Sequence, residues 1–216
     1  MKTFKELLIE LRACSEAREW AEDKTIEQVV EQCHRGDWLL WLARKVDIGL
    51  QPLTLAKGYC SNLVRHLMKD ERSINAVDAA IAFGEGKLSK EDLDAAYTAA
   101  YAVTPVTVDA AFSAAYAASF ASFAAAAAAY AAQPSASAYA AEASADAAAY
   151  ANCDAAAYAN CDAGVLPEQK RDLIAAVCAT KKENQIQTAN ICRKYIGDLI
   201  IDKVNELLNT EDDTER

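Results

Sequence analysis

The amino-acid sequence predicts an all-α fold, a multi-helix bundle with an Ala-rich helical segment. Three observations support this prediction. Apolar residues recur three and four positions apart through most of the chain, a long tract is dominated by alanine, and no run of β-branched residues alternates with polar ones. The 216 residues fit a single helical domain, 1–216, with a sizeable core. We divide it into an N-terminal helical part, an Ala/Tyr/Asp-rich part, a C-terminal helix or helix pair and a frayed tail: 1–88, 89–166, 167–209 and 210–216.

The first three helices are expected before residue 53, where the fourth begins. A helix over 4–21 is predicted by apolar residues that share one face: Phe4, Leu7, Leu8, Leu11 and Cys14. The sequence from Thr25 to Gln28 has the form of a capping box and predicts the start of a short second helix. A third helix is predicted after Gly36, with Asp37 as its N-cap. Its expected core residues are Trp38, Trp41 and Leu42.

Two further helices are predicted before the Ala-rich part. The fourth covers 53–67, with an apolar face that we expect to hold Leu55, Tyr59, Leu63 and Leu67. Ser73 is the expected N-cap of the fifth helix, which ends at Gly84-Glu85-Gly86. The fifth helix is expected to bury Ile74, Val77, Ile81 and Phe83. Ser89 is a further expected cap and opens the Ala-rich part.

The stretch between Lys90 and Lys170 holds nine carboxylates and accounts for almost all of the net charge of −10. Between Lys90 and Lys170 there is no Lys, Arg or His. Pro105 and Pro134 divide the tract into three predicted helices, near 89–103, 107–132 and 135–163. An aromatic row with spacing four is either packed among Ala-faced helices or used on the surface for binding: Phe112, Tyr116 and Phe120. The nine carboxylates between Lys90 and Lys170 are Glu91, Asp92, Asp94, Asp109, Glu142, Asp146, Asp154, Asp162 and Glu168.

A perfect tandem repeat, AAAYANCD, fills 147–154 and 155–162. It places acidic and tyrosine side chains at regular intervals along an exposed helix. This face either keeps an Ala-rich helix in solution or docks a basic partner. The candidate partner-binding residues are therefore Asp146, Tyr150, Asp154, Tyr158 and Asp162.

The C-terminal part begins at Pro167, which suits the first turn of a helix. Apolar residues then recur at helical spacing from Leu173 to Leu207. The pattern fits one long helix or two helices broken near Lys182.

Charge and composition exclude several classes of protein. A strongly acidic chain disfavours nucleic-acid binding, which depends on cationic contacts to phosphate, and favours a basic partner. Residues 110–141 are uncharged, but Pro134, several serines and the lack of Leu, Ile and Val argue against a membrane span. Glu6 and Glu10 interrupt any signal-peptide core. Seven cysteines without a C-x-x-C pair are expected to be reduced thiols in a cytoplasmic protein.

The residues of common catalytic and metal sites are not found. His34 and His66 have no third metal partner at a usual spacing. Cys33 next to His34 suggests a thiol beside a base, but adjacent residues on a helix point apart, so we expect a role in the capping loop. No phosphate-binding loop or nucleophile elbow is present. We therefore expect a non-enzymatic protein without a cofactor or a metal.

The order of the motifs resembles the immunity proteins of bacterial polymorphic toxin systems, which also occur in phages and prophages. The sharpest motif is Cys33-x-Arg35-Gly36-Asp37-Trp38-Leu39-Leu40-Trp41-Leu42, and Asp70-Glu71-Arg72, Gly84-Glu85-Gly86 and Cys192-Arg193-Lys194-Tyr195 follow in order. The resemblance covers most of the chain, but the prolines and the many Ser and Phe of the tract depart from its pattern. It implies a protein that neutralises a toxin by direct binding. The alternatives are a structural or self-assembling protein, with Ala-faced helices packed between subunits of a homo-oligomer, and an enzyme on an all-α scaffold.

Overall fold

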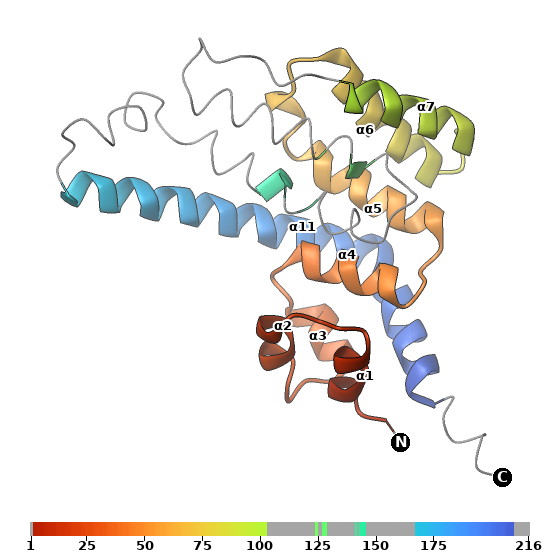
Figure 1. Cartoon of the computed structure of the whole chain (residues 1–216), viewed down its shortest axis with the longest axis vertical. Helices are drawn as coiled ribbons and strands as arrows, with labels where there is room; N and C mark the ends of the chain where they lie inside the picture. Colours follow the sequence, from red (N-terminus) through yellow and green to blue (C-terminus); the bar gives the residue numbers. More distant parts are fainter. Residues whose placement is uncertain are drawn as a thin grey trace.

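The computed structural model describes residues 2–102 and 167–209 and, between them, only 124, 127, 128, 141 and 143–145. Every regular element in these residues is helical, which confirms the all-α fold. The elements are, in order, α1 (Phe4–Glu10), α2 (Ser15–Trp20), α3 (Ile26–Gln32), α4 (Gly36–Lys45), α5 (Leu50–Asn62), η1 (Arg65–Leu67), α6 (Glu71–Gly84), α7 (Lys90–Tyr101) and α11 (Pro167–Asn209) (Figure 1). The predicted helices over 107–132 and 135–163, the aromatic row and the tail lie outside the described residues.

α11 is one continuous helix of 43 residues, so the C-terminal part is not a helix pair. No Gly or Pro occurs between residues 168 and 196, and nothing in the sequence near Lys182 forces a break. The helix packs against α3, α4 and α5. Its buried hydrophobic residues recur at helical spacing and are Ala189, Cys192, Ile196, Ile200 and Val204.

α5 is the central helix, because α4, α6 and α11 all contact it. The predicted apolar face of this helix is wrong: Leu55 and Tyr59 are only half-buried, as are Leu63 and Leu67 beyond its end. Packing on several sides buries other positions instead, including Leu53, Ala56, Lys57, Cys60 and Ser61. Polar residues on one of these faces bind backbone carbonyls, as Ser61 Oγ does to Ala124 O at 2.7 Å. An amphipathic pattern predicts a single buried face, so it misses a helix that is surrounded.

Two glycines allow helices to approach closely. A Cβ added at Gly36 would lie 2.4 Å from Thr188 Oγ1, so the start of α4 rests directly on α11. A Cβ added at Gly84 would lie 2.7 Å from Leu55 Cα, so the end of α6 rests on the backbone of α5. The predicted break at Gly36 and stop at Gly84 therefore coincide with contacts between helices that only glycine fits.

Local capping signals were predicted well in two cases and wrongly in two. Thr25 caps α3 in a capping box with Gln28, and Ser89 caps α7, as expected. Asp37 is not an N-cap, because α4 already begins at Gly36 and Asp37 is buried in its first turn. Ser73 is buried inside α6, and the cap is Asp70, whose side chain accepts from Arg72 N.

The predicted first helix is two helices, because the chain reverses after α1. Arg12 N donates to Ile9 O at 3.0 Å and Ala13 N donates to Leu8 O at 2.9 Å, which together form a Schellman motif. Arg12 adopts the left-handed conformation that this motif requires, with a φ of 61°. Cys14 follows the turn and is exposed, so it does not continue the apolar face of α1.

Between residues 103 and 166, the few residues that the structure describes are buried. Ala124, Ala128 and Ala143 pack in one cluster with residues of α6 and α7, among them Val77 and Leu93. Small side chains let backbones approach closely, which explains alanine at these positions. Within the described residues, no helix has both the length and the apolar character needed to cross a membrane.

Candidate functional site: a tryptophan pocket between the N-terminal helices and α4

A cavity of about 320 Å³, partly open to solvent, lies where α1, α2 and α3 meet α4. All three tryptophans of the chain line it, although they come from two different helices. The remaining lining is mostly aliphatic, with four polar or thiol side chains. The lining residues are Phe4, Leu8, Arg12, Ala13, Cys14, Ala17, Trp20, Ala21, Val29, Cys33, Asp37, Trp38, Leu39, Trp41 and Leu42. We call this cavity the tryptophan pocket.

Two of the indoles are held together in an aromatic cluster with His34. The ring centroids of Trp20 and Trp38 lie 6.0 Å apart, and that of His34 lies 6.1 Å and 6.5 Å from them. All the rings are tilted or edge-on to each other, the geometry that aromatic quadrupoles prefer. α2 is thereby fixed against the start of α4.

Each tryptophan also carries a cation over its ring. Lys24 Nζ lies 4.5 Å from the centroid of Trp20, Arg35 Cζ lies 4.8 Å from that of Trp38, and Lys45 Nζ lies 5.7 Å from that of Trp41. None of the three cations lines the cavity. Cation–π contacts of this kind each contribute about 0.5–1 kcal/mol at exposed sites. They help to hold the indoles in place and leave the cavity side free of these charges.

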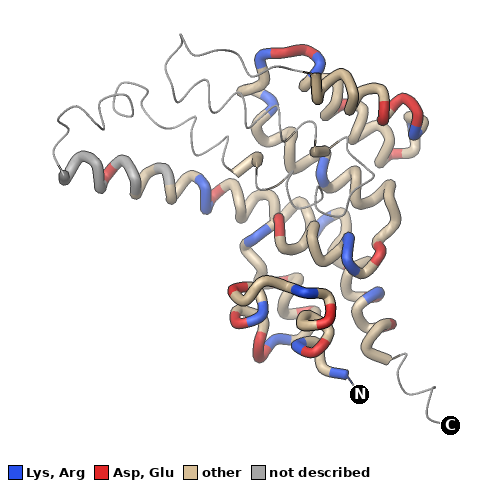
Figure 2. Tube along the Cα trace, in the orientation of Figure 1, with Lys and Arg blue, Asp and Glu red and all other residues tan. Residues whose placement is uncertain are grey.

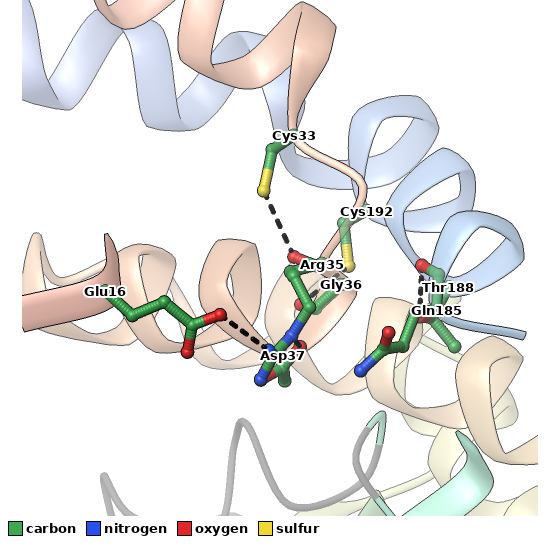
Figure 3. A network of polar contacts seen from close by, with 8 residues as sticks. All are labelled: Glu16, Cys33, Arg35, Gly36, Asp37, Gln185, Thr188 and Cys192. Atoms are coloured by element: carbon green, nitrogen blue, oxygen red, sulfur yellow. Dashed lines mark hydrogen bonds and ion pairs between the residues drawn. The ribbon is translucent and has the colours of Figure 1, made fainter. Parts of the chain in front are cut away.

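The buried carboxylate of the pocket is neutralised by its neighbour. Arg35 Nε donates to Asp37 Oδ1 at 2.8 Å and Arg35 Nη2 donates to Asp37 Oδ2 at 2.6 Å (Figure 3). Asp37 is 8% exposed, and the start of α4 adds the favourable end of a helix dipole. Glu16 Oε1 lies 3.8 Å from Arg35 Nη1 and links α2 to the pair. Both oxygens of Asp37 thus have a cationic partner.

Cys33 lines the pocket as a protonated thiol. Its Sγ donates to Arg35 O at 3.4 Å. Burial raises the pKa of Cys33 to about 11, the nearby carboxylate of Asp37 acting in the same direction. A nucleophilic cysteine needs the thiolate form near neutral pH, so the geometry does not favour Cys33 as a nucleophile. His34, the neighbour considered as a base, lies in the aromatic cluster.

Arg12 is the one lining side chain that is both charged and exposed. Within the described residues its guanidinium makes no hydrogen bond and no ion pair, in contrast to the paired Asp37. The rim of the pocket therefore carries an uncompensated positive charge next to an apolar interior. Across the same part of the chain, no group of three His, Cys, Asp or Glu residues is placed to hold a metal ion.

The five predicted partner-binding residues lie outside the described residues: Asp146, Tyr150, Asp154, Tyr158 and Asp162. They stay a prediction. The tryptophan pocket was not predicted, because Trp38 and Trp41 were assigned to the core and are only half-buried. A usable signal was present, since all three tryptophans fall within 22 residues of a 216-residue chain.

Comparison of the chain with known protein families, with curated proteins and with solved structures finds no match.

Proposed function

We propose that this protein is a non-enzymatic, cytoplasmic binding protein of the immunity type, which neutralises a basic toxin by direct contact. The observation that carries the proposal is the convergence of all three tryptophans on one partly open cavity. Tryptophan is enriched among the residues that contribute most of the binding energy at protein interfaces, where such residues lie in well-packed, desolvated pockets. The resemblance to immunity proteins of polymorphic toxin systems agrees with this class of function.

The charge around the pocket supports a basic partner. Residues 2–32, which form the three helices below α4 in Figure 1, carry eight carboxylates and five cationic side chains. Figure 2 shows acidic positions distributed around these helices. All eight carboxylates are exposed: Glu6, Glu10, Glu16, Glu19, Glu22, Asp23, Glu27 and Glu31. Exposed carboxylates on the helices that surround an apolar pocket give electrostatic steering to a cationic partner. The acidic repeat 147–162 has the same sign and is a second proposed contact surface.

The alternative, self-assembly through Ala-faced helices, has less support. The described alanines between residues 103 and 166, such as Ala124 and Ala128, are buried against helices of the same chain. Alanines that are already packed within one subunit are not free to pack between subunits.

The test begins with capture from an extract of the native host by immobilised protein, at low and then high salt. A captured basic protein is then expressed alone, and its effect on growth is measured with and without this chain. The proposal expects growth arrest by the captured protein and rescue by the wild-type chain. The triple variant Glu16→Gln, Glu19→Gln, Glu22→Gln should rescue less well, because it removes three of these exposed carboxylates.

The matched control is Glu91→Gln on α7, which also removes an exposed carboxylate and lies on a helix that does not line the pocket. It should rescue as well as the wild type. A captured protein that does not arrest growth, or equal rescue by the triple variant, would count against the proposal.

A further inference from the structure

We infer that the tryptophan pocket also binds a small apolar carboxylic acid, with its hydrocarbon body in the cavity and its carboxylate on Arg12. This inference does not depend on the proposed toxin partner. It rests on three features: the size and lining of the cavity, the balance of charge in its wall, and the backbone of Arg12.

The cavity fits a ligand of this kind in size and in polarity. Its volume of about 320 Å³ lies at the lower end of the range for small-molecule sites. Aliphatic and aromatic side chains make up most of the wall, with Phe4, Leu8 and Trp41 among them. Burial of a hydrocarbon chain here should raise the affinity about fourfold per methylene until the cavity is filled.

The charges in the wall select an anion over a cation. Asp37 is the carboxylate that could attract an ammonium group, but Arg35 occupies both of its oxygens at 2.6 Å and 2.8 Å. Arg12 lines the same cavity, and its guanidinium has no partner in the part of the chain that the structure describes. A guanidinium binds a carboxylate through two parallel hydrogen bonds, the strongest pairing available to this side chain. The ligand head group that this wall best accommodates is therefore a carboxylate.

The backbone of Arg12 gives an independent argument. Three helices end in the same Schellman motif, and the residue at its left-handed position is Arg12 after α1, Asp47 after α4 and Gly86 after α6. Glycine is preferred there because it has no Cβ to clash, and Asp tolerates the conformation better than most residues. Arg12 has neither advantage and is kept in a disfavoured conformation. Strain retained at the rim of a cavity is typical of a residue whose side chain is needed for binding.

The intrinsic fluorescence of the protein measures binding directly, because the pocket holds every tryptophan of the chain. We would titrate the full-length protein at pH 7.5 with three ligands that share one eight-carbon chain: octanoate, 1-octanol and octyltrimethylammonium. We expect octanoate to bind most tightly. Its affinity should exceed that of octanol by about tenfold or more, because a hydrogen bond to a charged group contributes about this much. Tighter binding of octyltrimethylammonium, or no fluorescence change with any of the three, would overturn the inference.

The variant Arg12→Gly separates binding from folding. It removes the guanidinium and relieves the backbone, so the thermal midpoint should stay level or rise while the preference for octanoate over octanol disappears. Asp47→Gly is the matched control, since it makes the same change of backbone in the same motif away from the pocket, and it should keep the preference. Ala17→Leu, which adds a larger side chain to the wall, should weaken all ligands alike. An octanoate preference that survives in Arg12→Gly would disprove the role of Arg12.

Discussion

Lys57 Nζ donates a hydrogen bond to the carbonyl oxygen of Ala127 at 3.2 Å, across 70 positions of the sequence. Lys57 is 1% exposed, in the middle of the central helix α5. A buried ammonium is costly unless it is well solvated by protein dipoles. This contact therefore joins the core helix to the Ala-rich part through a group whose protonation depends on pH.

The first prediction concerns the pH dependence of stability. Burial lowers the pKa of Lys57 to about 7, and the positive charge of Arg44 acts in the same direction. The unfolded chain keeps the proton up to its ordinary pKa of 10.5, so between pH 7 and 10.5 the unfolded state binds more protons than the folded state. Stability must then rise with pH in this window. From pH 7.0 to 8.5 we expect the free energy of unfolding to increase by roughly 1–2 kcal/mol, measured by urea denaturation.

Lys57→Met should abolish this rise, whereas Lys69→Met, a change of an exposed lysine, should keep it. The range ends at pH 8.5 because two buried cysteines oppose the rise at higher pH. Burial raises the pKa of both Cys33 and Cys192 in the folded protein, so these thiols ionise first in the unfolded chain and thereby lower stability. An equal slope in Lys57→Met and in the wild type would show that another group carries the pH dependence.

The second prediction tests the contact between α4 and α11. A Cβ at residue 36 would lie 2.4 Å from Thr188 Oγ1 and 2.7 Å from the Thr188 backbone carbon, so the helices would have to separate. Gly36→Ala should lower the free energy of unfolding by about 3 kcal/mol, because the added methyl group overpacks a contact in which the backbone of α11 cannot move aside. Gly49→Ala is the control, because its Cβ would meet only Pro52 at 3.8 Å, and it should cost no more than about 1 kcal/mol, the loss expected when alanine replaces glycine at an N-cap. Similar thermal midpoints for the two variants would contradict the close approach.

The elements predicted correctly are those that depend on nearby residues. The capping box at Thr25 and the cap at Ser89 are made by side chains within four positions, so the sequence contains them. The sequence does not decide whether α11 is one helix or two, because both alternatives use the same apolar pattern. The buried faces of α5 were missed because alanine, glycine, serine and lysine are buried there by neighbours distant in sequence, which a hydrophobic pattern does not register.

The tryptophan pocket also combines a feature that nearby residues determine with one that depends on contacts distant in sequence. The spacing of Trp38 and Trp41 predicts that both lie on a helix, and they do. Whether they fill a core or line a cavity depends on how α1 and α2 sit against α4. That arrangement depends on the reversal at Arg12, a residue that does not ordinarily mark a helix end.

The third prediction concerns the ion pair in the pocket wall. Removal of Arg35 alone leaves the Asp37 carboxylate nearly buried and without its cation, which typically costs about 3 kcal/mol. Arg35→Met should therefore be strongly destabilising, and the double variant Arg35→Met, Asp37→Asn should recover part of the loss by removing the unpaired charge. Urea denaturation of the wild type, both single variants and the double variant gives the coupling energy. A double variant no more stable than Arg35→Met would mean that the cation–π contact of Arg35 with Trp38 matters more than the ion pair.

The fourth prediction concerns a buried hydroxyl in α5. Thr54 is fully buried, and within the described residues its Oγ1 has no hydrogen-bond partner. Replacing an unsatisfied buried hydroxyl with a methyl group of the same shape removes a desolvation penalty, so Thr54→Val should stabilise the protein by about 1 kcal/mol. Thr188→Val is the matched change at a second buried threonine, but Thr188 Oγ1 donates to Gln185 O at 2.9 Å. It should therefore destabilise by about 1 kcal/mol, and thermal unfolding of both variants measures the difference. Equal shifts for the two substitutions would indicate that the Thr54 hydroxyl is satisfied in solution, since the satisfied and unsatisfied threonines would then respond alike.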